Sequence, residues 1–105
     1  MESTKNVTDA FEDEIVTEDL KTKDVRNLID SYCRMVIEEK LDIIKLKQST
    51  KIDKPLHFFE EFHGSMSRKC KEVQKGFRGK DVHKGFRVGK IFVNQSQVQS
   101  IFNAK

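Results

Sequence analysis

The two cysteines and three histidines are the sulfur and nitrogen side chains of this chain that are typical zinc ligands. His57 and His63 lie six residues apart, which on a helix places them about 120° from each other. His63 and Cys70 share a helical face, but seven residues separate them by about 10 Å along the axis. Ligands of one zinc ion must all lie within about 2.0–2.3 Å of it. We therefore expect no metal site.

Catalytic chemistry has little support in the rest of the sequence. The paired acids Glu38–Glu39 and Glu60–Glu61 are adjacent, so on a helix each pair diverges by about 100° and cannot face one substrate. Cys33 lacks the positive surroundings or glycine-rich turn that would activate its thiol. The late glycines are not followed by the Lys-Ser or Lys-Thr of a phosphate-binding loop. We expect no catalytic residues, no cofactor, no small-molecule substrate and no enzymatic activity.

Basic side chains concentrate between residues 68 and 90, where nine lysines and arginines face only Glu72 and Asp81. Such a run is typical of a surface that binds nucleic acid or an acidic protein. Phe77 and Phe86 precede arginines and could stack on unpaired bases if exposed. The candidate binding residues are Arg68, Lys71, Lys75, Arg78, Lys80, Lys84, Arg87 and Lys90.

Charge is distributed unevenly along the chain. Residues 1–20 carry a net charge of −6 and residues 68–105 a net charge of +8, although the whole chain carries only +3. We expect residues 1–20 to form a flexible acidic segment, and residues 21–105 a single helical domain with a basic final third. The opposite ends could bind each other within one molecule or between two, so self-association is one expectation.

The composition also restricts the compartment. No run of 18 apolar residues is present, and the first residues lack the basic and apolar stretches of a secretory signal, so we expect no membrane association. Cys33 and Cys70 stand far apart in charged segments, which favours reduced thiols over a disulfide. An intracellular location, cytoplasmic or nuclear, is expected.

Apolar periodicity predicts a mainly α fold, a small bundle built on two long amphipathic helices. Apolar residues recur every three or four positions over about 23–48 and again over about 54–75, so each segment presents one stripe to a core. Pro55 suits the first turn of the second helix, and its stripe continues through Gly64. Gly76 is a suitable residue to end that helix.

The last third is less regular. Residues 86–93 are rich in β-branched and aromatic side chains, and although a helical stripe also fits them, Gly85 and Gly89 favour a short strand or irregular segment. A C-terminal helix is expected from Ser96 or Gln97 onward, with Val98, Ile101 and Phe102 toward the core.

Two functional classes are consistent with these features. The first is a non-enzymatic protein-interaction module, that is, an adaptor, a small regulator or inhibitor, or an assembly subunit that uses amphipathic helices and a charged surface. The alternative is a nucleic-acid-binding module that uses the basic surface of residues 68–90. We favour the first, because two helical stripes are firmer evidence than a run of charge.

Overall fold

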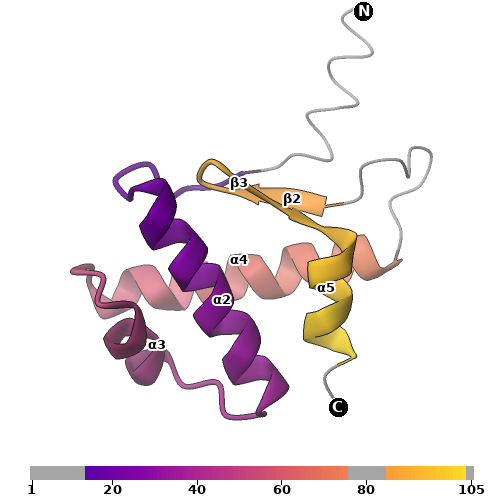
Figure 1. Cartoon of the computed structure of the whole chain (residues 1–105), viewed down its shortest axis with the longest axis horizontal. Coiled ribbons are helices and arrows are strands. Elements are labelled where there is room, and N and C mark those ends of the chain that lie inside the picture. Colours follow the sequence, from indigo (N-terminus) through magenta and orange to yellow (C-terminus); the bar gives the residue numbers. More distant parts are fainter. Residues whose placement is uncertain (1–13, 76–84, 104–105) are drawn as a thin grey trace, which may run out of the picture.

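Four helices and three short strands make up the part of the chain that the computed structural model describes, residues 14–75 and 85–103. The small sheet lies beside the first turns of α2 and α5 and alongside α4, and α2 and α5 both lie over α4 (Figure 1). The predicted mainly α small bundle is confirmed. In chain order the elements are β1 (Glu14–Ile15), α2 (Thr22–Ile37), α3 (Ile43–Thr50), α4 (Leu56–Lys75), β2 (Gly85–Val88), β3 (Ile91–Asn94) and α5 (Gln95–Phe102).

The helix predicted over residues 23–48 is divided into α2 and α3. α2 ends because Glu39 adopts a left-handed backbone conformation with φ 57°. The N–H of Glu39 donates to the carbonyl of Val36, and the N–H of Lys40 donates to that of Met35. This pair of bonds is the Schellman motif that closes many helices. Glycine usually occupies the left-handed position, so a glutamate there carries no signal in the sequence.

Asp42 begins α3 by accepting hydrogen bonds from two backbone N–H groups at its start. Its Oδ1 lies 2.9 Å from the nitrogen of Ile44 and 3.3 Å from that of Lys45. An aspartate at this position is a favoured helix N-cap. The acid-rich gap that precedes Asp42 and this capping residue were the available signs that the long apolar stripe contains two helices.

The second predicted helix is present as one uninterrupted element, α4. It begins directly after Pro55 and passes through Gly64 without a break. The predicted stripe faces the core, and its fully buried members are Phe59, Phe62, Met66, Cys70 and Val73. The helix stop predicted at Gly76 lies outside the described residues.

Residues 86–93, for which the sequence favours a short strand or irregular segment, lie in a β-hairpin. β2 pairs antiparallel with β3, and β1 pairs parallel with the other edge of β2, so the sheet order is β1-β2-β3. Gly89, in the two-residue turn, has φ +62°, and a Cβ there would lie 2.3 Å from Oγ1 of Thr17. The turn therefore requires glycine for its backbone conformation and for the close approach of the 16–20 loop.

The hairpin passes directly into α5, which confirms the predicted C-terminal helix. The side chain of Asn94 accepts from the N–H of Gln97, and the side chain of Gln97 accepts from the N–H of Asn94. This reciprocal capping box satisfies two N–H groups that would otherwise lack partners. Val98 and Ile101 are buried.

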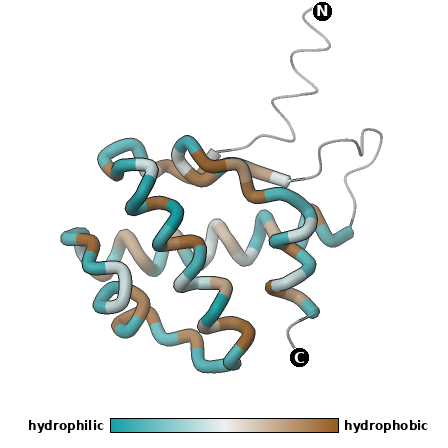
Figure 2. Tube along the Cα trace, in the orientation of Figure 1, coloured by the Kyte–Doolittle hydropathy of each residue, from teal (hydrophilic) through white to brown (hydrophobic). Residues whose placement is uncertain are grey.

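All these elements contribute side chains to one hydrophobic core. Along α2, apolar and polar residues alternate at helical spacing, as the hydropathy colours show (Figure 2). Residues 14–20, which the sequence groups with the acidic segment, form β1 and the loop to α2, and Ile15 is buried against the core. Residues 1–13 of that segment lie outside the described part.

Candidate protein-interaction surfaces

Three of the predicted binding residues lie on α4. Arg68, Lys71 and Lys75 are all exposed, and their spacing of three and four residues places them on the helical face opposite the buried stripe. Their neighbour Lys69 is different, because only 12% of its side chain is exposed and its Nζ lies 3.8 Å from a carboxylate oxygen of Glu72. The exposed face of α4 therefore carries a row of three bases.

The remaining predicted residues belong to the hairpin or to the undescribed segment. Arg87 is exposed on β2, and Lys90 is exposed in the turn that follows. Arg78, Lys80 and Lys84 lie outside the described residues, as does Phe77. Phe86 is only 1% exposed, so its suggested stacking on bases is contradicted: its ring belongs to the core.

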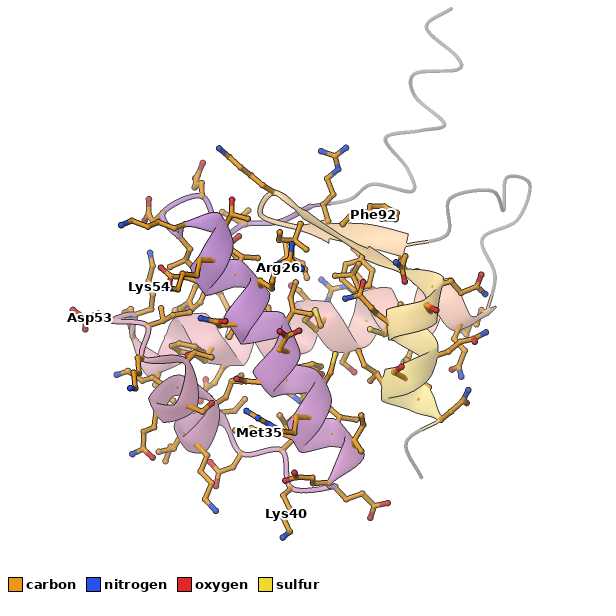
Figure 3. All side chains as sticks on the ribbon, in the orientation of Figure 1. Arg26, Met35, Lys40, Asp53, Lys54 and Phe92 are labelled. Atoms are coloured by element: carbon orange, nitrogen blue, oxygen red, sulfur yellow. The ribbon has the colours of Figure 1, made fainter. Side chains whose placement is uncertain are left out.

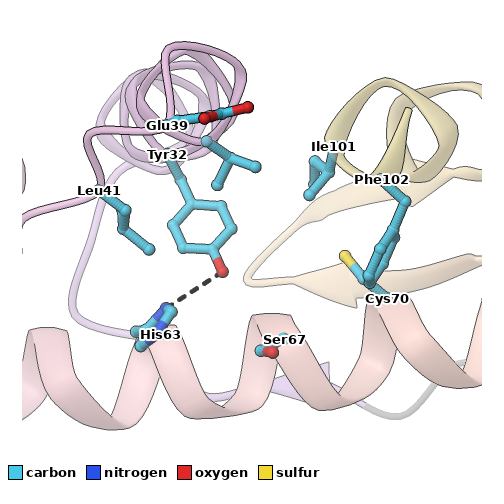
Figure 4. Close-up of a pocket in the computed structure, with 9 residues that line it drawn as sticks. Tyr32, Glu39, Leu41, His63, Ser67, Cys70, Ile101 and Phe102 are labelled. Carbon is cyan, nitrogen blue, oxygen red and sulfur yellow. Dashed lines mark hydrogen bonds between the residues drawn. The ribbon is translucent and has the colours of Figure 1, made fainter. Parts of the chain in front are cut away.

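A groove of about 510 Å³ opens between α2 and α5, with α4 as its floor (Figure 4). We call it the α2–α5 groove. Its walls are mainly apolar, and its lining residues come from all three helices and the loop after α2. They are Tyr32, Val36, Glu39, Leu41, His63, Ser67, Cys70, Ile101 and Phe102.

Two polar side chains form a hydrogen bond at the floor of this groove. The hydroxyl of Tyr32 on α2 lies 3.1 Å from Nδ1 of His63 on α4. The Tyr32 ring also packs edge-on against Phe62, with 5.6 Å between the ring centroids. Burial raises the pKa of Tyr32, so the phenol remains a neutral hydrogen-bonding group. The floor is therefore fixed in position and carries no charge from this tyrosine.

The thiols near this groove are suited to packing rather than to nucleophilic attack. Cys33 and Cys70 are both free cysteines. Burial, with a smaller contribution from Cys33, raises the pKa of Cys70 to about 12. Burial raises the pKa of Cys33 to about 11, with a smaller contribution from Asp30. Because the thiolate is the reactive form, neither cysteine is activated.

A second groove, of about 490 Å³, lies between α3 and the start of α4, and we call it the α3–α4 groove. Ile44 and Leu56 line it and are 56% and 40% exposed, whereas Ile52, which also lines it, is buried. Asp53 also lines this groove, at the end of the molecule where α3 leads into α4 (Figure 3). Lys47 and Lys51 line it on the α3 side.

Neither groove was predicted from the sequence. Tyr32 and His63 lie 31 residues apart and meet only because α2 crosses α4. Ile44 lies within the apolar stripe predicted over residues 23–48, but it is 56% exposed. The break after α2 turns α3 so that Leu46 is buried and Ile44 faces outward.

Among residues 14–75 and 85–103, no three His, Cys, Asp or Glu side chains lie close enough together to hold a metal ion. Within the same residues, no helix combines the length and the apolar composition needed to cross a membrane.

This chain matches no family model, no curated protein and no solved structure.

Proposed function

We propose that this chain is a non-enzymatic protein-interaction module, acting as an adaptor, a small regulator or inhibitor, or an assembly subunit. The observation that carries this proposal is the α2–α5 groove, an apolar depression formed by three helices around a fixed polar floor. A depression of this kind suits an apolar side chain from an amphipathic partner helix. Free thiols at Cys33 and Cys70 are consistent with a cytoplasmic or nuclear location.

The chemistry of the groove favours a partner with a large apolar side chain. Val36, Leu41 and Phe102 are partly buried and pack on the core, so a partner that covers them removes further apolar surface from water. Such burial contributes about 25 cal/mol for each Å² of apolar surface. The Tyr32–His63 pair gives the floor a defined shape, which supports selectivity among apolar side chains.

A peptide selection on the full chain tests this proposal. Ser67 lies on the floor of the groove, and Ser67→Trp places a large ring there (Figure 4). Ser100→Trp is the matched control, because Ser100 is exposed on α5 and does not line the groove. Phage-displayed peptides are selected on the unmodified chain, and the affinities of the selected peptides are then measured for each variant.

We expect the selected peptides to share a large apolar residue and to bind Ser67→Trp at least about ten-fold more weakly, a difference of about 1.4 kcal/mol. Ser100→Trp should retain their affinity. Selection of no peptides, or equal binding to Ser67→Trp, would count against the groove as a binding site. Thermal unfolding of each variant verifies that the fold is retained.

Nucleic-acid binding is the second candidate function, and the exposed row Arg68, Lys71 and Lys75 on α4 favours it. If these three bases each contact one phosphate of duplex DNA, log K falls with log salt at a slope of about −3. Replacing one of them, as in Lys71→Gln, should make that slope shallower by about 1.

Fluorescence anisotropy with labelled single- and double-stranded oligonucleotides across a salt series measures this slope. Lys40→Gln is a suitable control, because Lys40 is exposed in the loop after α2 and lies outside the row. No association at about 50 mM salt, where phosphate contacts are strongest, would eliminate this candidate.

A further inference from the structure

The α3–α4 groove combines apolar walls with flanking lysines. Among residues 14–75 and 85–103, four large apolar side chains are exposed, and two of them, Ile44 and Leu56, border this groove. Ile52 also lines the groove, and its side chain is buried. Exposed apolar side chains on both borders of one depression are typical of a contact surface rather than of scattered surface residues.

The geometry of α3 and its C-terminus explains where the two lysines of the groove lie. Leu46 on α3 is buried, so Lys47, one position later, lies on the neighbouring face about 100° away, and Lys51 follows α3 as its C-cap residue with a left-handed φ of 58°. Both lysines line the groove. They place two positive charges on the α3 side of the groove, which complements carboxylates on a partner.

We propose that this groove binds an acidic amphipathic helix of a partner protein. A large apolar side chain of the partner lies between Ile44 and Leu56, and partner carboxylates contact Lys47 and Lys51. The proposal goes beyond the α2–α5 groove, because it concerns a different surface and commits to the charge of the partner. Asp53 at the same groove repels an acid placed beside it, and so restricts the partner's carboxylates to the α3 side.

The adjoining surface already holds one contact of this kind. Nζ of Lys54, the residue that follows the lining residue Asp53, lies 2.9 Å from a carboxylate oxygen of Asp19. The apolar character of Ile44, Ile52 and Leu56 favours a peptide over a nucleic acid. Bases bind protein surfaces by stacking on aromatic rings, and the lining of this groove contains none.

A fluorescein-labelled peptide tests the proposal with the full chain. Its leucines recur at helical spacing, and glutamates four residues apart flank them. One comparison peptide carries serines in place of the leucines, and a second carries lysines in place of the glutamates. Anisotropy measures the affinity of each peptide at low and at high salt.

Two chain variants have matched controls elsewhere on the surface. Ile44→Ser removes the apolar border, and Ile37→Ser is its control, because Ile37 is 47% exposed and does not line the groove. Lys47→Glu reverses a flanking charge. Lys23→Glu is its control, since Lys23 is exposed at the start of α2.

We expect Ile44→Ser and Lys47→Glu each to weaken binding of the leucine–glutamate peptide at least ten-fold, whereas both controls retain the affinity. Both comparison peptides should bind at least ten-fold more weakly than the leucine–glutamate peptide, and high salt should weaken binding by screening the lysines. Unchanged affinity in Ile44→Ser or Lys47→Glu overturns the proposal. Displacement of the peptide by a single-stranded oligonucleotide at equal concentration also overturns it, in favour of a general polyanion surface.

The chain's own acidic residues supply one more decisive comparison. A full-length variant with Glu2, Asp9, Glu12 and Asp13 changed to their amides should bind the peptide as the unmodified chain does. If only this variant binds, residues 1–13 compete for the groove within the same molecule, and the assignment to a partner protein is overturned. None of these variants alters the α2–α5 groove, so failure here leaves the proposed function standing.

Discussion

The hydroxyl of Tyr32 and Nδ1 of His63 form a hydrogen bond across 3.1 Å, and this contact joins α2 to α4 beneath the α2–α5 groove. Because Tyr32 is buried, water does not readily replace a lost partner on its side of the contact. The bond therefore contributes to both the stability of the fold and the shape of the groove floor.

Tyr32→Phe should lower the free energy of unfolding by about 1–2 kcal/mol. The ring and its edge-on contact with Phe62 are retained, so the change isolates the hydroxyl. Urea unfolding measures the effect, and a double-mutant cycle with His63→Ala isolates the pair. A coupling energy below about 0.3 kcal/mol would contradict an energetically significant bond.

Stability should fall as the pH rises above about 8.5, where thiols of the unfolded chain begin to ionise. Burial raises the pKa of Cys33 to about 11 and that of Cys70 to about 12, and it also raises that of Tyr32. Between the unfolded and folded pKa values the folded chain binds more protons than the unfolded chain does. The contribution of these groups to stability is therefore complete below about pH 8.5 and is lost as the pH rises.

Urea unfolding at pH 7, 8.5 and 10 follows this loss, with a reducing agent present throughout. The double variant Cys33→Ser/Cys70→Ala should show a shallower pH dependence over the same interval, because Tyr32 alone then contributes. Equal pH dependence in the variant and the unmodified chain would show that the thiols do not cause it.

The parts of the fold that depend on local chemistry could be predicted from the sequence. Pro55 and the buried stripe from Phe59 to Val73 specify α4, and the Asn94–Gln97 capping box specifies the start of α5. The break after α2 is harder to recognise, because Glu39 occupies a left-handed position where glycine is usual, and only the residues up to the N-cap Asp42 indicate it.

The candidate surfaces were less predictable for a different reason. Charge on Arg68, Lys71 and Lys75 is visible in the sequence, and helical spacing alone places these bases on one face. The two grooves depend on how helices cross, as the contact of Tyr32 with His63 illustrates. No local pattern encodes a contact between side chains 31 residues apart.

Glu39→Gly should stabilise the chain by about 1 kcal/mol. A non-glycine residue in the left-handed region costs about 1–2 kcal/mol, and the greater freedom of glycine in the unfolded chain offsets part of that gain. Glu38→Gly is the matched control, because Glu38 has φ −82° and ψ −2°, which require no glycine. Thermal unfolding compares the two. Equal destabilisation by both changes would contradict backbone strain at Glu39.

Two glycines should respond in opposite directions to alanine. A Cβ at Gly64, exposed within α4, meets nothing within 4 Å, so Gly64→Ala should raise the free energy of unfolding by about 1 kcal/mol. At Gly89 the backbone has φ +62°, and a Cβ would lie 2.3 Å from Oγ1 of Thr17 and 3.1 Å from a methyl group of Val25.

Gly89→Ala should therefore lower the free energy of unfolding by about 2 kcal/mol or more, because it combines a left-handed backbone with overpacking. Urea unfolding of both alanine variants in one buffer provides the comparison. The additional variant Gly89→Ala/Thr17→Ser keeps the hydroxyl and serves as a control, whereas Gly89→Ala/Thr17→Gly removes the clashing side chain and should recover part of the loss. If Gly89→Ala alone leaves stability unchanged, the hairpin turn does not pack against the 16–20 loop as closely as the structure has it.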